Sequence, residues 1–127
     1  MVSVLQNVAI DCADAYGLAR FWSEVTGRPL GEEDRPGDHE VQVVMAEGPV
    51  LYFSQVAEPK TVKNRLHLCL RPQSTREEEV ERLLGLGATL VADRRNPDGS
   101  GWAVLADPEG NEFCVLRSES DLAAMKS

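Results

Sequence analysis

The chain has 127 residues, of which 43% are hydrophobic and 27% charged, values typical of one soluble globular domain. This composition excludes disordered, collagen-like and low-complexity proteins. The formal net charge of -8 disfavours nucleic acid and anionic membrane surfaces as partners, because an acidic chain repels phosphate groups.

The three cysteines indicate a reducing compartment. Cys12, Cys69 and Cys114 form no CxxC pair, and each lies within an apolar run, where a thiol behaves as a small hydrophobe. We therefore expect buried, inert thiols rather than disulfides. The chain shows no basic N-terminal stretch followed by an apolar segment and no run of about 18 apolar residues, so a cytoplasmic protein is expected.

The first half of the chain predicts a strand, a helix and two further strands. Residues 3–12 alternate between apolar and polar side chains, as in a half-buried strand. Asp14 is a good N-cap for a helix that ends near Thr26, before a glycine and a proline. Its apolar face is formed by Leu18, Phe21, Trp22 and Val25. After an acidic loop that contains His39, residues 41–46 and 50–56 read as strands.

In the second half the pattern restarts after a polar connector. Residues 65–71 are expected to form a strand with Leu66, Leu68 and Leu70 on one face. Thr75 and Glu78 have the spacing of a capping box and begin a second helix, which Gly85 and Gly87 end. Its buried face comprises Val80, Leu83 and Leu84, and its solvated face Glu77, Glu78, Glu79 and Glu81. Three strands (88–93, 102–106 and 112–117) follow, with a tight turn at 107–111 and a polar tail from Ser118 that is suited to a short helix.

The pattern therefore predicts an α+β protein built from two β-α-β-β-β modules, about 3–58 and about 64–118, within a single domain spanning 1–127. The register supports a duplication, since Gly27 and Leu30 recur sixty positions later as Gly87 and Leu90. In the same register Asn7 corresponds to His67. A repeat of this length is a whole supersecondary module and not a solenoid unit.

This arrangement predicts a cavity. Each helix covers one face of its sheet, and the other face carries side chains too apolar for open water: Tyr52, Trp102, Val104, Cys114 and Leu116. Two half-covered sheets can share these faces as a cup, which is where small ligands bind. Functional residues are therefore sought at Asn7, Tyr52, His67, Cys114 and their neighbours.

Several segments resemble the glyoxalase/bleomycin-resistance family, also called the vicinal oxygen chelate superfamily, and in particular its glyoxalase-like branch. The resemblance spans nearly the whole chain and is most specific at its end. The segments that carry it are 10–14 (IDCAD), 18–22 (LARFW), 25–27 (VTG), 63–68 (KNRLHL), 87–88 (GA) and 106–115 (ADPEGNEFCV). It implies two tandem βαβββ modules that form a curved mixed sheet around a cavity, a fold that serves both enzymes and binding proteins.

The resemblance also implies where a metal ion would bind. Metal-dependent members use four side chains, usually His, Gln or Glu, from the first and last strands of each module, and these positions fall at Asn7, Tyr52, His67 and Cys114. Only His67 is an ordinary ligand, and no carboxylate is present to compensate a divalent charge. The family commonly has Asp where Cys69 stands, so a group that could orient His67 is missing. We therefore expect neither a bound metal nor another cofactor.

The remaining candidates allow two interpretations each. His67 is the one candidate general base with an ordinary pKa near neutrality, but it could instead be structural. Trp102 and Tyr52 could contact a ligand or simply pack, whereas Trp22 is expected in the core and His39 in solvent. Lys63 and Arg65 could anchor an anionic substituent or form salt bridges. The turn 107–111 is expected to shape the last hairpin without touching a ligand.

The sequence thus predicts a metal-independent protein that binds a small molecule, cationic or aromatic, at Asn7, Tyr52, His67, Trp102 and Cys114, and that acts by sequestration. The alternative is a lyase or isomerase that uses His67 as its base, with or without a divalent metal, and an accessory subunit is a third interpretation. The resemblance makes a homodimer the expected assembly.

Overall fold

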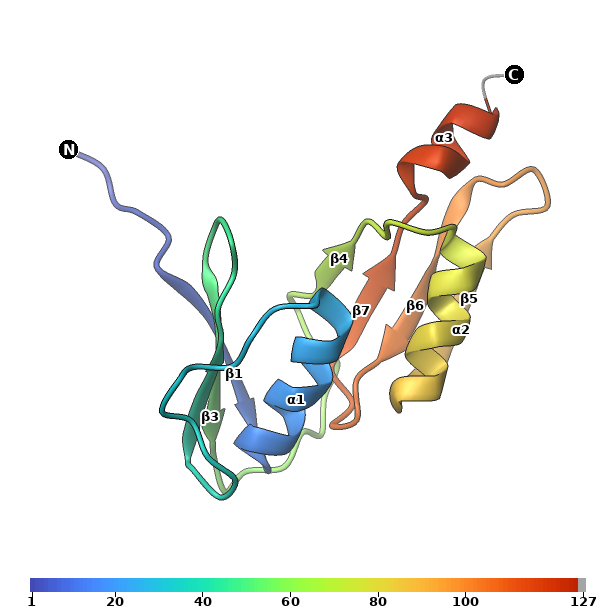
Figure 1. Ribbon diagram of the computed structural model, residues 1–127. Helices are drawn as coiled ribbons and strands as arrows, with labels where there is room; N and C mark the ends of the chain where they lie inside the picture. The colour runs from blue at the N-terminus through green and yellow to red at the C-terminus, as the bar shows by residue number, and fades with distance from the viewer. Residues whose placement is uncertain (126–127) are drawn as a thin grey trace. The chain divides into compact units, whose positions relative to one another are not determined.

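The structure is a computed structural model that describes residues 1–125 (Figure 1). The chain divides into two compact units, Met1–Thr61 and Val62–Ser127. Each unit contains one mixed sheet and at least one helix, which confirms the α+β class. Among the described residues, no helix combines the length and the apolar character needed to span a membrane.

The first unit consists of a helix and a three-stranded sheet in the order β1-β3-β2. β1 pairs with β3 in parallel and β2 pairs with β3 antiparallel. Its elements are β1 (Asn7–Cys12), α1 (Ala15–Thr26), β2 (Glu40–Val43) and β3 (Val50–Gln55). Leu18 and Trp22 of α1 are buried in the core together with Phe53 of β3. The predicted core position of Trp22 is therefore confirmed.

Both predicted helix ends of α1 are present. The Asp14 side chain accepts a hydrogen bond from the Gly17 backbone N–H, which satisfies one of the N–H groups at the helix start. Gly27 ends the helix with a φ of 68°, a left-handed conformation that glycine adopts without steric cost. Gly87, its counterpart in the second unit, also ends a helix in this conformation, with a φ of 116°.

The second unit has the complete β-α-β-β-β order, followed by a short helix. Its four-stranded sheet has the order β4-β7-β6-β5, in which only the β4–β7 pairing is parallel. The elements are β4 (Leu68–Leu70), α2 (Arg76–Leu86), β5 (Thr89–Arg95), β6 (Gly101–Ala106), β7 (Glu112–Val115) and α3 (Glu119–Met125). The predicted capping box of Thr75 and Glu78 begins α2.

Alternation along the strands gives this sheet two different faces. Leu105, Phe113 and Val115 are fully buried on the face against which α2 packs with Val80 and Leu83 (Figure 1). The residues between them in sequence necessarily lie on the opposite face, because successive side chains of a strand alternate. That opposite face carries the site described below.

Four details differ from the sequence predictions. Leu66 is 87% exposed rather than buried, because β4 begins only at Leu68. Glu79 is buried, at 8% exposure, because its carboxylate binds the guanidinium of Arg82 instead of extending into solvent. Gly85 lies within α2 and only Gly87 ends it. In the first unit, the β-α-β-β-β order calls for three strands after the helix, but two form, β2 and β3, and Leu30 makes a single bridge to Val43.

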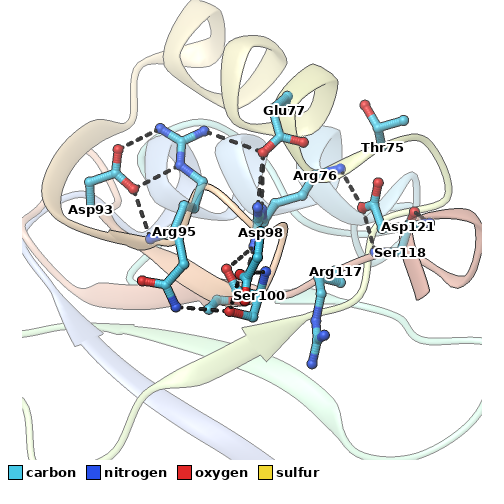
Figure 2. A network of polar contacts seen from close by, with 12 residues as sticks. Thr75, Arg76, Glu77, Asp93, Arg95, Asp98, Ser100, Arg117, Ser118 and Asp121 are labelled. Atoms are coloured by element: carbon cyan, nitrogen blue, oxygen red, sulfur yellow. Dashed lines mark hydrogen bonds and ion pairs between the residues drawn. The ribbon is translucent and has the colours of Figure 1, made fainter. Parts of the chain in front are cut away.

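A polar network ties the start of α2 to the C-terminal segment (Figure 2). The Asp121 carboxylate accepts hydrogen bonds from the backbone N–H groups of Arg76, at 2.9 Å, and Ser118, at 2.8 Å. The guanidinium of Arg76, a residue only 3% exposed, donates to the backbone carbonyls of Ser100, in the turn after β5, and Gly101, the first residue of β6. One cluster therefore joins three segments that lie far apart in the sequence.

Replacing Asp121 by Ala is expected to destabilise the protein by about 1 kcal/mol, because two backbone N–H groups lose their acceptor. Urea unfolding followed by circular dichroism measures this change. The matched control is Glu119→Ala in the same short helix, which removes an equal charge from an exposed position and should change the stability by less than about 0.5 kcal/mol. Equal losses in the two variants would contradict the assigned role of Asp121.

The same network predicts a loss of stability in acid. Partial burial opposes ionisation of Asp121, but hydrogen bonds from Ser118 and Arg76 outweigh it and hold the pKa of this carboxyl below its ordinary value. Hydrogen bonds from Arg95 likewise lower the pKa of Asp93 to about 2. Both carboxyls have a lower pKa in the folded than in the unfolded state. The stability that the two carboxylates contribute is therefore present above about pH 4 and is lost as the pH falls further. Below about pH 4, the free energy of unfolding of Asp121→Ala should fall less steeply with decreasing pH than that of the wild-type protein. An equal pH dependence in the two proteins would contradict this prediction.

Candidate ligand-binding site

The second unit contains a pocket of about 340 Å³ on the sheet face opposite α2. This volume is in the range of small-ligand sites. The lining is mostly apolar or sulfur-containing, with a few charged groups, and consists of Lys63, His67, Cys69, Ala92, Arg94, Trp102, Val104, Glu112, Cys114 and Leu116.

Strand alternation and one bulge place these side chains together. In β6 and β7, every second residue points into the pocket, which brings Trp102 and Cys114 to it while Leu105 and Phe113 face the core. The pairing of β5 with β6 shifts at Val91, and this shift sets Arg94 directly opposite Trp102. Without the bulge, Arg94 would lie on the other face.

Of the charged groups in the pocket, Lys63 and Glu112 neutralise each other. The Lys63 Nζ lies 3.0 Å from both carboxylate oxygens of Glu112, whose side chain is 17% exposed. Asn64 also donates a hydrogen bond to the side-chain oxygen of Asn111, which fastens the segment before β4 to the turn before β7. The salt-bridge interpretation of Lys63 is therefore confirmed, and Arg65 is not part of the lining.

The turn 107–111 has the structural role that the sequence predicts. The buried Asp107 carboxylate accepts hydrogen bonds from the backbone N–H groups of Glu109 and Asn111. Gly110 has a φ of 88°, in the left-handed region that favours glycine. This turn fixes the point at which β7 starts, and so the depth of Glu112 and Cys114 in the pocket.

His67, Cys69 and Cys114 form a cluster in the pocket. One ligand atom from each, an imidazole nitrogen or a thiol sulfur, lies within 4.8 Å of the other two. Cys69 and Cys114 are direct register partners in the parallel pairing of β4 with β7. Burial, followed by the nearby Cys69 thiol, raises the pKa of Cys114 to about 11. The Cys114 thiol by itself is thus a poor nucleophile at neutral pH.

The structure brings three of the five predicted site residues together: His67, Trp102 and Cys114 all line the pocket. Asn7 and Tyr52 belong to the first unit, where both lie on the sheet face that α1 does not cover, and their place in the same cavity stays a prediction. The Tyr52 hydroxyl donates a hydrogen bond to the Glu40 carboxylate.

The four positions at which the resemblance implies a metal do not suit a hard divalent ion here. The Tyr52 hydroxyl is engaged with Glu40, Asn7 offers a neutral amide, and the family positions in the second unit hold an imidazole and a thiol. Hard ions such as Mg²⁺ and Ca²⁺ need oxygen ligands with negative charge. These four residues are therefore the wrong set for them.

Sequence reasoning missed Arg94 and misjudged Cys69. Arg94 escapes a simple alternation count because the bulge at Val91 changes its face. Cys69 lines the pocket and is exposed rather than buried. Its pairing with Cys114 shows only when the first and last strands of the module are aligned in parallel. That alignment was the available signal.

Comparison with known proteins places the chain in a family. The model of the family described as "Glyoxalase-like domain" matches residues 7–116, and no curated protein matches the sequence.

Solved structures share its fold at low sequence identity. A glyoxalase/bleomycin resistance protein/dioxygenase family enzyme from Burkholderia phytofirmans PsJN is 22% identical, with 89% of this chain and 97% of that one covered and a TM-score of 0.68. The fosfomycin resistance protein FosX from Listeria monocytogenes is 16% identical over 98% of both chains, with a TM-score of 0.70. A glyoxalase-related enzyme from Fulvimarina pelagi is 22% identical, covering 90% and 87%, with a TM-score of 0.65.

The family match covers both units, and these structures share the α+β fold, which confirms the resemblance to the vicinal oxygen chelate superfamily. The chain belongs to the glyoxalase-like domain family.

Proposed function

We propose that the protein binds a flat small molecule that carries an anionic group, in the pocket of its second unit. The observation that supports this proposal best is the register pair of Arg94 and Trp102, which sets a cation and a large ring side by side at the pocket wall. The family alone does not choose between binding and catalysis, because one fold supports both.

Trp102 provides the aromatic part of the recognition. Its side chain remains 44% exposed although it lines the pocket, so an indole surface is available to a ligand. Aromatic rings gain energy by stacking beyond what burial of their area provides. Val104 and Leu116 extend this apolar wall.

Arg94 provides the charge preference. Lys63 and Glu112 form an ion pair, whereas the Arg94 guanidinium has no hydrogen-bond or ion-pair partner within residues 1–125. The lining therefore carries a net positive charge in a protein of formal charge -8. A positively charged lining repels a cation. Of the two ligand types that the sequence suggests, it therefore favours an aromatic molecule over a cationic one.

Calorimetric titration with naphthoate and with naphthylmethylammonium tests this charge preference, since the two probes share a ring system and differ in charge. We expect naphthoate to bind more tightly. Arg94→Gln should weaken naphthoate binding by about 2- to 5-fold, as expected for a partly exposed ion pair, and reduce the preference. Arg65→Gln is the matched control, because Arg65 is exposed and outside the lining. Tighter binding of the cation would contradict the proposal.

Trp102→Ala should weaken binding of both naphthyl probes by about 5- to 10-fold, since the lost stacking and contact area do not depend on the probe's charge. Leu90→Ala is the control, because Leu90 is an exposed apolar residue of β5 that does not line the pocket. Unchanged binding in Trp102→Ala would show that the indole is not a wall of the site.

The position of His67 in the pocket supports a second candidate, a lyase or isomerase in which this imidazole removes a proton next to a carbonyl. Phenylpyruvate, an aromatic anion with such a proton, is a suitable probe in deuterium oxide. On this mechanism the protein should accelerate deuterium exchange at the benzylic carbon, and His67→Gln should abolish the acceleration while retaining binding. Exchange no faster than in buffer would leave sequestration as the function.

A homodimer in the cytoplasm stays a prediction.

A further inference from the structure

The pocket contains a cluster of three possible metal ligands that binding of the flat anion at Arg94 and Trp102 does not use. Cys69 and Cys114 lie side by side across β4 and β7, and His67 precedes Cys69 by two residues. The nitrogen or sulfur atom that each offers lies within 4.8 Å of the other two. Three side chains from two strands thus converge on one point.

We propose that His67, Cys69 and Cys114 form a binding site for a thiophilic metal ion of the Zn²⁺ class. This site differs from the four-residue set that the family resemblance implies, because Cys69 is outside that set and all three donors come from one unit. It departs from the expectation of a metal-free protein drawn from the sequence.

The distances suit a tetrahedral ion after a small adjustment. With Zn–S bonds of about 2.3 Å and a Zn–N bond of about 2.0 Å, two donors around a tetrahedral ion are separated by roughly 3.4–3.8 Å. Donors within 4.8 Å of one another need to approach by about 1 Å, which side-chain rotation supplies. The backbone register already holds both cysteines at the required depth.

The charge and the softness of the three donor atoms determine which class of metal ion the site would bind. Two thiolates compensate the charge of a divalent ion, and a bound metal ion deprotonates the thiols that coordinate it. Thiolates and imidazole select Zn²⁺, Cu⁺ or their heavier analogues, whereas Mg²⁺ and Ca²⁺ need oxygen ligands. The only carboxylate in the lining, that of Glu112, is bound to Lys63.

Three protein ligands leave a fourth coordination position open to the pocket. Zinc sites of this kind bind water or an exogenous ligand at the free position, in contrast to closed structural sites with four protein ligands. The anionic group of a ligand held by Arg94 and Trp102 would lie in the same pocket. The metal site itself does not depend on that ligand.

Titration of the reduced, chelator-treated protein with Co²⁺ tests the proposal without any organic ligand. We expect one equivalent to produce a thiolate-to-cobalt charge-transfer band and the visible spectrum of tetrahedral cobalt, both abolished by Zn²⁺ and unaffected by excess Mg²⁺. Absence of the charge-transfer band at one equivalent would overturn the proposal. The naphthoate titrations test Arg94 and Trp102, which are not among the proposed metal ligands. The metal site and the binding of an aromatic anion can therefore be refuted independently of each other.

Variants assign the ligands. Cys69→Ser and His67→Gln should each weaken Co²⁺ binding by about 100-fold or more, since even outer-shell changes cost 10- to 100-fold. His39→Gln is the matched control: it makes the same change as His67→Gln at an exposed imidazole of the first unit and should bind Co²⁺ normally. Unchanged Co²⁺ binding in both His67→Gln and Cys69→Ser would overturn the assignment.

Alkylation of the wild-type protein provides a test that requires no substitution, which matters because Cys114→Ser alters a buried residue and can impair folding. Iodoacetamide should modify the exposed Cys69 first, and one equivalent of Zn²⁺ should slow that reaction by 10-fold or more, as read by mass spectrometry of the Cys69 peptide. An unchanged rate with Zn²⁺ would contradict the proposal.

Discussion

The parallel register between β4 and β7 is the constraint on which the site depends. It sets Cys69 beside Cys114 and, through the alternation of the strands, turns both toward the pocket while Leu70 pairs with Val115 on the other face. Residues that follow the same alternation, Glu112 and Leu116, complete that wall. A one-residue slip would exchange the two faces and move the pocket residues into the core.

The register is held by forces outside the pocket. Phe113 and Val115 are fully buried beneath α2, so any slip would bring the polar Glu112 into the core at a high cost in free energy. The Asp107 carboxylate fixes the turn before β7, and the pair of Asn64 with Asn111 fastens the segment before β4 to it. The pocket is therefore organised by an apolar core on one face and by turn hydrogen bonds at one end.

Much of the fold follows from local sequence signals. The caps at Asp14, Thr75, Gly27 and Gly87 and the apolar stripe of the first helix predict both helices almost to the residue, because capping depends on side chains close in sequence. The β-α-β-β-β order predicted one strand too many in the first unit, because a strand needs a partner along its length and Leu30 makes a single bridge to Val43. Burial of Glu79 was also missed, because the four glutamates of α2 were assigned to its solvated face as a group although Glu79 pairs with Arg82.

The candidate site could be predicted only in part. His67, Trp102 and Cys114 follow from the alternation of polar and apolar residues. Arg94 does not, because a bulge is invisible to a regular count, and Cys69 lies on the right face but was interpreted by residue type alone. Both residues acquire their importance from a partner on another strand, which periodicity along one strand does not reveal.

Nuclear Overhauser contacts between β4 and β7 in the reduced protein test the central claim most directly. Backbone contacts should connect Leu68 with Phe113, Cys69 with Cys114 and Leu70 with Val115. Contacts displaced by one residue, with Cys69 beside Phe113 or Val115, would place the two thiols on opposite faces of the sheet and contradict the account.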